Sequence, residues 1–378
     1  MIFELKQYDT TLIVFKFEER RYEGQACRII SINENYKYLL PIGMTISDEG
    51  LLAWLKTRVV PKNREFVHQI LSRSGLSEND TLGIIKLCKG LSLNDSYWMV
   101  EQGFEGKFSK YNLYENSFSN ALALIAYTGY GTSTKKQFTS SPEFTTNGML
   151  RKCWRRINKK IFLYKGGTSG GANTGKEPYS EFYAAQIAER MGLNHVSYGL
   201  AKWKNLLCSV CELFTDIKTS YVPIYRFVND GTLPEVANYL KSLGGKYYNE
   251  FVDMLIFDAL IYNSDRHLGN FGLMVDNHTN RPIAFAPIFD NGLSLFNFAM
   301  DDEIENLKEY SKSRPSAFKA TFNQIAEDFI SERQREKLRK MINFKFSKHV
   351  KYNLSQRRLS KIEEFLQIRI NELLNIKK

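Results

Sequence analysis

The sequence has little of what builds disulfide frameworks, zinc sites or membrane spans. Its five cysteines are odd in number, scattered and without histidines at metal-ligand spacing, which argues against the first two. The longest apolar run, Met254 to Tyr262, is interrupted by Asp258 and is far shorter than the roughly 20 residues of a transmembrane helix. The N-terminal MIFELKQYDTT lacks the basic and apolar regions of a secretion signal. We therefore expect a cytoplasmic globular protein without a membrane span, although nothing here argues against secretion into a host.

Only one cysteine pair has the spacing of a motif, Cys208 and Cys211 in CSVC. No second pair accompanies it, and it lies within NLLCSVCELFT, which we interpret as a buried strand. We therefore expect a structural role for this pair rather than redox chemistry or metal binding.

The sequence has fewer acidic than basic residues, with 41 Asp and Glu and 52 Lys and Arg, and its net charge is +11. Such an excess indicates an anionic partner or simply a soluble surface. Residues 331–378 hold 14 basic residues against five glutamates, but apolar residues at helical spacing from Leu359 to Leu373 favour an amphipathic helix with a solvated basic face. Direct nucleic-acid binding is therefore an alternative that we do not favour. A second basic cluster, RKCWRRINKK at 151–160, lies where a phosphate is expected below.

The chain is long enough for two or three packing units, and 43% of its residues are hydrophobic. The first 30 residues alternate as strands do, and a helix-rich block follows that includes an amphipathic helix within residues 61–76. Residues 131–143 are rich in Ser, Thr and Lys without apolar periodicity, which predicts a linker or mobile loop.

After this segment the pattern changes from strands to helices. Residues 145–167 predict two strands with a turn at Asn147-Gly148, and a glycine-rich break at 166–175 precedes a helix that ends at Gly192. Residues 195–215 predict two more strands, and the chain is mainly helical from about 235 onward. We therefore predict an α+β protein with an N-terminal α/β accessory domain (1–130), a small β-rich lobe (131–215) and a helical lobe (216–378).

The stretch LIYNSDRHLGNFGLM, residues 260–274, concentrates the polar chemistry of the chain. Asp265 and Asn270 are five residues apart, and Asp290 follows 20 residues later. Phosphoryl transfer requires oxygen ligands for Mg²⁺ and a carboxylate that accepts a hydroxyl proton. Protein kinases arrange a catalytic Asp, an Asn and a second Asp in this order. The spacing therefore predicts Asp265 as the proton acceptor and Asn270 and Asp290 as Mg²⁺ ligands.

Candidates for the phosphate-binding lysine and its partner glutamate are also present, N-terminal to this motif. Lys165 ends the predicted strand IFLYK, and Glu181 lies in the next helix 16 residues later. Kinases place in this way the lysine that binds the α- and β-phosphates and the glutamate that aligns it. The turn containing Asn147 and Gly148, next to Arg151, is suited to cover a nucleotide with its backbone amides.

Three further polar residues near Asp265 call for an interpretation. We interpret Asp258, seven residues earlier, as a buried hydrogen-bonded support. His267 is expected to support the cofactor site by packing under the loop or by bonding a backbone carbonyl, rather than by transferring a proton. Arg266 or nearby basic residues are expected to offset charge on the transferred phosphoryl group.

The motifs NSDRHLGNFGLM and APIFDNGLSLF, preceded by LYKGG and EPYSEFYAAQIAERMGL, resemble the HipA-like family of bacterial serine/threonine kinases, CtkA-type relatives included. The similarity covers residues 140–300. It implies a bilobal protein-kinase-like fold with ATP and Mg²⁺ as cofactors, and the same roles for Lys165, Glu181, Asp265, Asn270 and Asp290. It also implies that CELFT joins the lobes and reads adenine with backbone groups of Glu212 and Phe214.

The resemblance also implies partners. Family members phosphorylate protein Ser or Thr hydroxyls and autophosphorylate, for which Thr145 and Thr146 in the nucleotide-covering turn are the candidates here. Members that are toxins are neutralised by a small DNA-binding antitoxin. Because the N-terminal block and the glycine-rich segment depart from the toxin pattern, the substrate and the antitoxin stay open.

Two alternatives remain. The order D-R-H-x-x-N is also reminiscent of phosphoinositide kinases, so a lipid or small-molecule hydroxyl is a second candidate substrate, with the basic C-terminus binding an anionic headgroup. The other is an ATP-sensing module that binds DNA or a partner. Loss of a metal ligand would favour this module, but both predicted ligands are present.

Overall fold

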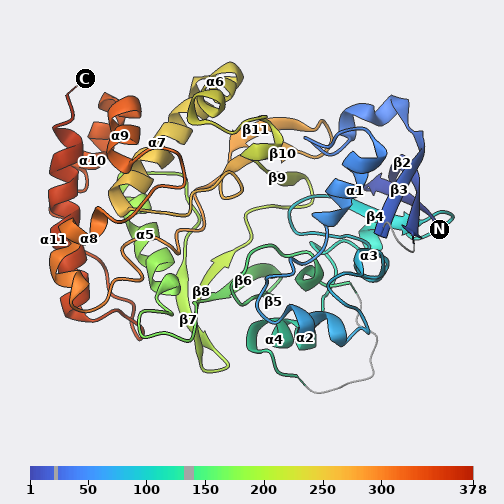
Figure 1. The fold of residues 1–378 in the computed structure, drawn as a ribbon, viewed down its shortest axis with the longest axis horizontal. Helices are drawn as coiled ribbons and strands as arrows, with labels where there is room; N and C mark the ends of the chain where they lie inside the picture. Colours follow the sequence, from blue (N-terminus) through green and yellow to red (C-terminus); the bar gives the residue numbers. More distant parts are fainter. Residues whose placement is uncertain (21–23, 132–139, 378) are drawn as a thin grey trace. The chain divides into compact units, whose positions relative to one another are not determined.

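The computed structural model describes residues 1–20, 24–131 and 140–377 (Figure 1). The predicted linker at 131–143 lies largely outside the described residues. The described chain forms two compact units. The first unit comprises Met1–Tyr164, Leu213–Val222 and Met274–Ile283, and the second comprises Lys165–Glu212, Pro223–Leu273 and Ala284–Lys378.

The first unit begins with a four-stranded antiparallel sheet in the order β3-β2-β1-β4 (Figure 1). Its strands are β1 (Ile2–Gln7), β2 (Thr10–Arg20), β3 (Gly24–Ile32) and β4 (Tyr97–Glu101). Alternate residues of β1, such as Phe3 and Leu5, are buried because successive side chains of a strand point to opposite faces. The strands predicted for the first 30 residues are therefore confirmed.

Short helices complete the core of the first unit. They are η1 (Glu34–Leu39), α1 (Asp48–Lys56), α2 (Val67–Ser72), α3 (Thr81–Cys88), η2 (Phe108–Lys110), α4 (Asn120–Thr128) and η3 (Pro142–Phe144). Leu51 and Trp54 of α1 pack with Ile85 of α3 and Phe15 of the sheet in one apolar cluster. The helix predicted within residues 61–76 is shorter than expected, because Phe66 has a left-handed φ of 65° and α2 begins only after it.

One of the two strands predicted within residues 145–167 is present, namely the strand that ends in IFLYKGG, which is β6 (Lys160–Gly166). β6 pairs with β5 (Lys152–Ile157), and the two are joined at Asn158-Lys159, where φ is 49° and 71°. The described residues between η3 and Asn147-Gly148 form no strand, so the strand and hairpin turn predicted there are wrong. The physical reason is that the Thr146 hydroxyl donates a 2.7 Å hydrogen bond back to the Pro142 carbonyl, which favours a helical turn over an extended strand.

The second unit begins with elements that follow the sequence prediction closely. Helix α5 (Glu177–Met191) ends at Gly192, whose φ of 68° is left-handed as in many helix C-caps. It is followed by the antiparallel pair β7 (Gly199–Trp203) and β8 (Leu206–Glu212). The strand order of the sheet that contains them is β5-β6-β8-β7.

The rest of the second unit is mainly helical, as predicted. Its helices are η4 (Ile224–Arg226), α6 (Leu233–Leu243), α7 (Gly245–Ile261), η5 (Glu303–Asn306), α8 (Leu307–Ser311), α9 (Phe322–Phe329), α10 (Glu332–Arg339) and α11 (Gln356–Leu374). The apolar face of α11 is buried, and α11 contacts α7 and α10 (Figure 1). Its buried apolar residues are Leu359, Ile362, Phe365, Leu366, Ile370 and Leu373. This confirms the amphipathic helix predicted for the basic C-terminal region. No helix among the described residues is long and apolar enough to cross a membrane.

Three further strands form a separate small sheet in the order β11-β10-β9. They are β9 (Thr219–Pro223), β10 (Gly272–Asp276) and β11 (Arg281–Phe285). β10 begins two residues after Asn270 and β11 ends before Asp290, so this hairpin lies between the two predicted metal ligands along the chain.

The units divide the chain differently from the predicted domains. The division falls inside β6, between Tyr164 and Lys165, and again after Glu212. The predicted accessory domain, residues 1–130, therefore shares one unit with β5 and most of β6. The three-domain organisation with boundaries at 130 and 215 stays a prediction, and the described contacts group the residues into two units instead.

Candidate active site

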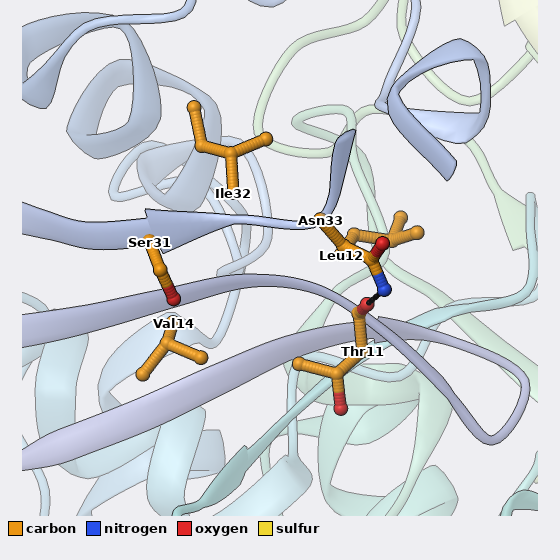
Figure 2. Close-up of a pocket in the computed structure, with 6 residues that line it drawn as sticks. All are labelled: Thr11, Leu12, Val14, Ser31, Ile32 and Asn33. Carbon is orange, nitrogen blue, oxygen red and sulfur yellow. Dashed lines mark hydrogen bonds between the residues drawn. The ribbon is translucent and has the colours of Figure 1, made fainter. Parts of the chain in front are cut away.

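The cavity drawn in Figure 2 lacks ionisable side chains. It has a volume of about 180 Å³ and lies along β2 and β3, where the Asn33 side-chain amide donates a hydrogen bond to the Thr11 carbonyl at 3.0 Å. Its lining is Thr11, Leu12, Val14, Ser31, Ile32 and Asn33. Without an acid, a base or a cation it offers no group for phosphoryl transfer, and the candidate site is the cluster around Lys165 in the second unit.

The Lys165 amine pairs with the carboxylates of Glu181 and Asp290, which the sequence predicted to lie in the same site. Its Nζ lies 2.8 Å from Oε1 of Glu181 on α5 and 2.5 Å from Oδ1 of Asp290. Burial of Lys165 lowers the pKa of its amine, but the charges of Asp290 and Glu181 outweigh this and raise that pKa above its usual value. Lys165 is therefore a fixed cation at neutral pH.

Glu181 is held in place by β8. It is buried, and the Ser209 hydroxyl donates a hydrogen bond to its Oε2. The same hydroxyl lies 3.3 Å from the Lys165 carbonyl, so Ser209 ties the glutamate to the strand that carries the lysine. Ser209 was not expected from the sequence, because a serine inside a strand carries no signal of a partner on another element.

Asp265 and Asn270 are brought together by the loop that follows α7. The helix ends at Tyr262, which has a left-handed φ of 52°. The Asn270 side-chain amide donates to the Asp265 carbonyl at 2.9 Å, and the Asp265 N–H donates to Asn263 at 3.3 Å. Burial and the nearby Asp290 carboxylate raise the pKa of Asp265. The five predicted residues therefore gather in one cluster of the second unit.

Asp290 has an unusual backbone conformation. Its φ is 54°, which is uncommon for a residue other than glycine. Its N–H donates to the Tyr198 hydroxyl at 3.1 Å, and two residues earlier Ile288 forms a parallel bridge with His195. These contacts fix the backbone on the N-terminal side of Asp290.

Arg266 is the buried centre of the site. Its guanidinium donates to the Asp258 carboxylate at 2.8 and 3.1 Å and to Asn291 at 2.6 Å. It also donates to the carbonyls of Asn270 at 3.0 Å and Phe289 at 2.5 Å. These bonds join the loop of Asp265 to the segment of Asp290. The expectation that Arg266 offsets charge on a phosphoryl group is therefore corrected, because its donors are already used by buried acceptors.

The prediction for Asp258 is confirmed, whereas the predicted contacts of His267 are not present. Asp258 is 3% exposed and also accepts from Asn263 at 3.1 Å, so the predicted buried support is confirmed. His267 is exposed, and its Nδ1 accepts the Gly269 N–H at 3.0 Å. The predictions that His267 packs under the loop or bonds a carbonyl are therefore wrong. Arg266 occupies the space beneath the loop instead. Its guanidinium has five N–H donors and can bond several buried oxygens at once, whereas an imidazole has only two ring nitrogens.

The two candidate autophosphorylation residues belong to the first unit, and both hydroxyls are already bonded. Thr145 is 5% exposed and donates to the Leu91 carbonyl at 2.8 Å. Thr146 accepts a hydrogen bond from the Trp154 indole at 2.9 Å. Phosphorylation of either residue therefore requires these bonds to break.

The remaining residues of the predicted nucleotide turn are also in the first unit. The Asn147 carbonyl accepts from Lys152 Nζ at 2.9 Å, and Gly148 has a φ of 91°. Arg151 pairs with Glu65 at 3.4 Å. Two cations of the basic cluster at 151–160, Arg151 and Lys152, therefore already bind groups of the first unit.

The segment predicted to read adenine crosses the division between the units. Glu212 ends β8 in the second unit, and Phe214 lies in the first, where its ring meets Tyr221 edge-on at 5.8 Å. Between them the Leu213 N–H donates to the Ile161 carbonyl at 2.8 Å. The adenine-reading role of Glu212 and Phe214 stays a prediction.

The donor set fits Mg²⁺ bound together with phosphates. The described residues contain no group of three or more His, Cys, Asp or Glu side chains that could hold a metal. Mg²⁺ is commonly bound by one or two protein oxygens plus substrate phosphates and water. Asn270 uses its Nδ2 for the Asp265 carbonyl, which leaves Oδ1 as its ligand atom, and Asp290 supplies a carboxylate. A two-residue set of this kind suits a nucleotide-bound ion.

Part of the chain is similar in sequence to a known kinase. No family model matches the chain. The serine/threonine-protein kinase CtkA of Helicobacter pylori strain J99 is 28% identical over 140 residues, which cover 32% of this chain and 42% of CtkA. The match thus spans less than half of that relative.

The chain also matches two solved structures, of which the second has a TM-score above 0.5. The crystal structure of a Helicobacter pylori proinflammatory kinase CtkA is 20% identical with a TM-score of 0.48 and covers 61% of this chain and 91% of its own. The Shewanella oneidensis MR-1 toxin–antitoxin complex of HipA, HipB and operator DNA contains a chain that is 13% identical with a TM-score of 0.52, covering 100% of both chains. In fold, and over the segment shared with CtkA in sequence, this chain resembles the HipA-like kinases.

Proposed function

We propose that the protein is an ATP- and Mg²⁺-dependent serine/threonine protein kinase of the HipA-like type. The observation that carries this proposal is the bonding of Lys165 to both Glu181 and Asp290, beside the loop in which Asn270 bonds Asp265. This is the set of groups that phosphoryl transfer requires, in the order that kinases use. The sequence similarity to a kinase, CtkA, supports it.

Each residue has a role that follows from its contacts. Lys165, a fixed cation, binds phosphate oxygens of ATP, and Glu181 keeps its amine in place. Asp265 accepts the proton of the substrate hydroxyl as the γ-phosphoryl group is transferred. Asn270 and Asp290 hold Mg²⁺, which when bound neutralises charge on the phosphates. Arg266 holds Asn270 and Asp290 close to each other, because it bonds the carbonyl of Asn270 and that of Phe289, the residue before Asp290.

The proposal is tested by Mg²⁺-[γ-³²P]ATP labelling of a cell extract. We expect Asp265→Asn to lower the labelling rate by about 100-fold or more, because a positioned base contributes on this scale. Asp276→Asn is the matched control, since Asp276 is half-buried at the end of β10 and its Oδ1 accepts hydrogen bonds from Thr279 of the following turn, which an Asn Oδ1 can also accept. Equal labelling by wild type and Asp265→Asn, or none by either, would exclude a kinase. Label in lipid with none in protein would instead support the lipid-kinase alternative.

We also propose autophosphorylation at Thr145 or Thr146. The added phosphate would lie near Arg151 and Lys152 in sequence and would break the bonds of these hydroxyls to Leu91 or Trp154. Intact-mass spectrometry after incubation with Mg²⁺-ATP should show one added phosphate, lost in the Thr145→Val, Thr146→Val double variant. An unchanged mass, or a phosphate that persists in the double variant, would contradict this assignment.

A small DNA-binding antitoxin is the partner that we propose, together with a toxin role and a cytoplasmic location. The support is the similarity in fold to the HipA complex, which contains HipB and operator DNA. Expression in a bacterial host should slow growth for wild type and not for Asp265→Asn. Co-expression of a small DNA-binding protein encoded next to this chain should restore growth, and no slowing by wild type would argue against the toxin role.

A further inference from the structure

The segment after α8 is basic and is attached to the active-site loop. Residues 311–320, SKSRPSAFKA, contain three basic residues and no acidic one. We define the basic segment as residues 312–319. One guanidinium nitrogen of Arg314 donates to the Ser264 hydroxyl at 2.9 Å, and Ser264 directly precedes Asp265. This places the guanidinium of Arg314 against the residue that directly precedes the proposed proton acceptor.

The other end of the basic segment is also attached to this loop. The Phe318 ring meets Phe271 edge-on, with ring centroids 6.3 Å apart. Phe271 is buried and directly follows Asn270. The basic segment is thus attached to the residues on either side of the stretch from Asp265 to Asn270.

The basic segment is also fixed internally. The Ser316 hydroxyl accepts the Phe318 N–H at 3.1 Å and donates to the Ala320 carbonyl at 2.5 Å. The Arg314 N–H donates to the Ser311 carbonyl at 3.1 Å. These bonds define a turn, so Arg314 is presented from a structured segment rather than from an extended loose chain.

The three cations of the basic segment differ in what they can bind. Lys312 is paired with Glu309 at 2.6 Å, and both side chains are exposed. Lys319 is exposed, and Arg314 is half-buried. The contact with Ser264 uses a single N–H of Arg314, whereas a guanidinium has five in a planar fork that matches a carboxylate. Arg314 can therefore bind a carboxylate while it stays attached to the loop.

We propose that Arg314, with Lys319, determines substrate specificity by binding an acidic side chain near the phosphorylated Ser or Thr. This inference rests on the proposed function and names its substrate class, a hydroxyl-bearing peptide with flanking Asp or Glu. A guanidinium beside the proton acceptor favours peptides whose carboxylates reach it, and a charge-assisted pair of this kind gives specificity as well as affinity.

The test measures kcat/KM of the full chain for two synthetic peptides. One has a serine flanked on both sides by Asp and Glu, and the other has Asn and Gln at those positions. The readout is the ratio of the kcat/KM for the acidic peptide to that for the neutral peptide. Inactive protein lowers both values by the same factor, so it leaves this ratio unchanged. We expect wild type to prefer the acidic peptide and Arg314→Gln to lower this ratio about 5- to 10-fold, the scale of a partly exposed charge pair. Arg314→Lys should recover part of the preference.

Lys348→Gln is the matched control because it removes one positive charge from an exposed position next to Ser347, whose N–H bonds Gln186 of α5. Its ratio should equal that of wild type. The inference is overturned if wild type shows no preference, if Arg314→Gln keeps the full ratio, or if Lys348→Gln lowers it equally. In each of these cases peptide is still phosphorylated and the proposed function stands. Failure of the proposed function is distinct, because wild type would then label neither peptide nor any protein of an extract.

Discussion

Adjacent residues of the active-site loop have very different surroundings. Arg266 is 1% exposed and makes five hydrogen bonds to four groups, whereas the neighbouring His267 lies at the surface. Both are polar residues in one motif, so their order in the sequence does not show which one is buried. The buried position needs a donor for several carbonyls and a carboxylate at once, and the planar guanidinium meets this need.

Arg266 is predicted to be essential for stability. Arg266→Lys keeps the charge but loses the forked contacts to Asp258, Asn291 and two carbonyls, so we expect the free energy of unfolding to fall by about 3 kcal/mol. Urea denaturation measures this change. His267→Ala is the control and should stay within about 0.5 kcal/mol of wild type, as exposed substitutions usually do. An unfolding curve of Arg266→Lys that matches wild type would contradict the role of this residue.

Glu250 provides a pH-dependent prediction at the same scale. It lies with Asp253, Arg333 and Lys337 around a cavity of about 160 Å³. Burial raises the pKa of Glu250, the charge of Asp253 adds to this, and Lys246, Arg333 and Lys337 oppose it. Its Oε2 is buried without a hydrogen-bond partner among the described residues. The ionised carboxylate is therefore disfavoured in the folded state.

The sign of the effect follows from this raised pKa. The stabilisation from a protonated Glu250 is complete below its unfolded value of 4.5 and is lost as pH rises through the folded pKa. Glu250→Gln removes the charge at every pH. We expect it to be more stable than wild type at about pH 7 and similar to wild type at about pH 4, where Glu250 is protonated in both states. Thermal melting at the two pH values checks this, and a variant that gains no stability at the higher pH would contradict it.

At the scale of elements, the positions of strands were easier to predict than the turns between them. The strand that ends in IFLYKGG was expected and is β6, but the turn before it was assigned to Asn147-Gly148 instead of Asn158-Lys159, and β5 between the two positions was not expected. Asn-Gly is the stronger turn pair in sequence statistics. Here Lys152 and Pro142 bind groups around Asn147, and this local network determines the conformation of that segment.

The turn at Asn158-Lys159 leads to a prediction about backbone strain. Lys159 has a φ of 71°, which glycine adopts without steric cost. We expect Lys159→Gly to raise the free energy of unfolding by about 0.5 kcal/mol, since relief of strain exceeds the entropy lost by glycine. Lys160→Gly, at the first residue of β6, should lower it by about 0.5–1 kcal/mol. Equal effects of the two substitutions in a denaturation experiment would refute this assignment of strain.

At the scale of the whole molecule, the first unit contains residues from both sides of the predicted boundary at 130. Leu93, Trp98 and Leu113 form one apolar cluster with Ile161 of β6. Arg64 pairs with Glu143 at 2.7 Å, and both side chains are fully buried. An accessory domain that ended at residue 130 would leave this cluster and this ion pair incomplete.

Two separate chains, 1–130 and 131–378, should therefore depend on one another. We expect 131–378 produced alone to aggregate, because Ile161 becomes exposed and Glu143 loses Arg64, whereas co-expressed chains should co-purify through a tag on one of them. Leu93→Asp in the shorter chain should abolish co-purification. Lys107→Asp, at an exposed position, should not. A soluble 131–378 chain that melts like the full protein would favour an independent N-terminal domain instead.

Local residue patterns were enough to predict the class of many elements and to propose the residues of the site. Periodicity located the first strands, the helix ending at Gly192 and the amphipathic C-terminal helix, because burial of one face imposes a local repeat. The order of Lys165, Glu181, Asp265, Asn270 and Asp290 predicted a cluster, and the structure brings these residues together.

Most of the contacts that hold that cluster in place became visible only in the folded chain. Ser209 and Arg266 act through bonds to residues on other elements, and such long-range pairing leaves no periodic signal in the sequence. The grouping of residues into units and the attachment of Arg314 beside Asp265 have the same origin. Buried polar groups must find partners wherever the fold brings them close, so their partners are known only once the chain is folded.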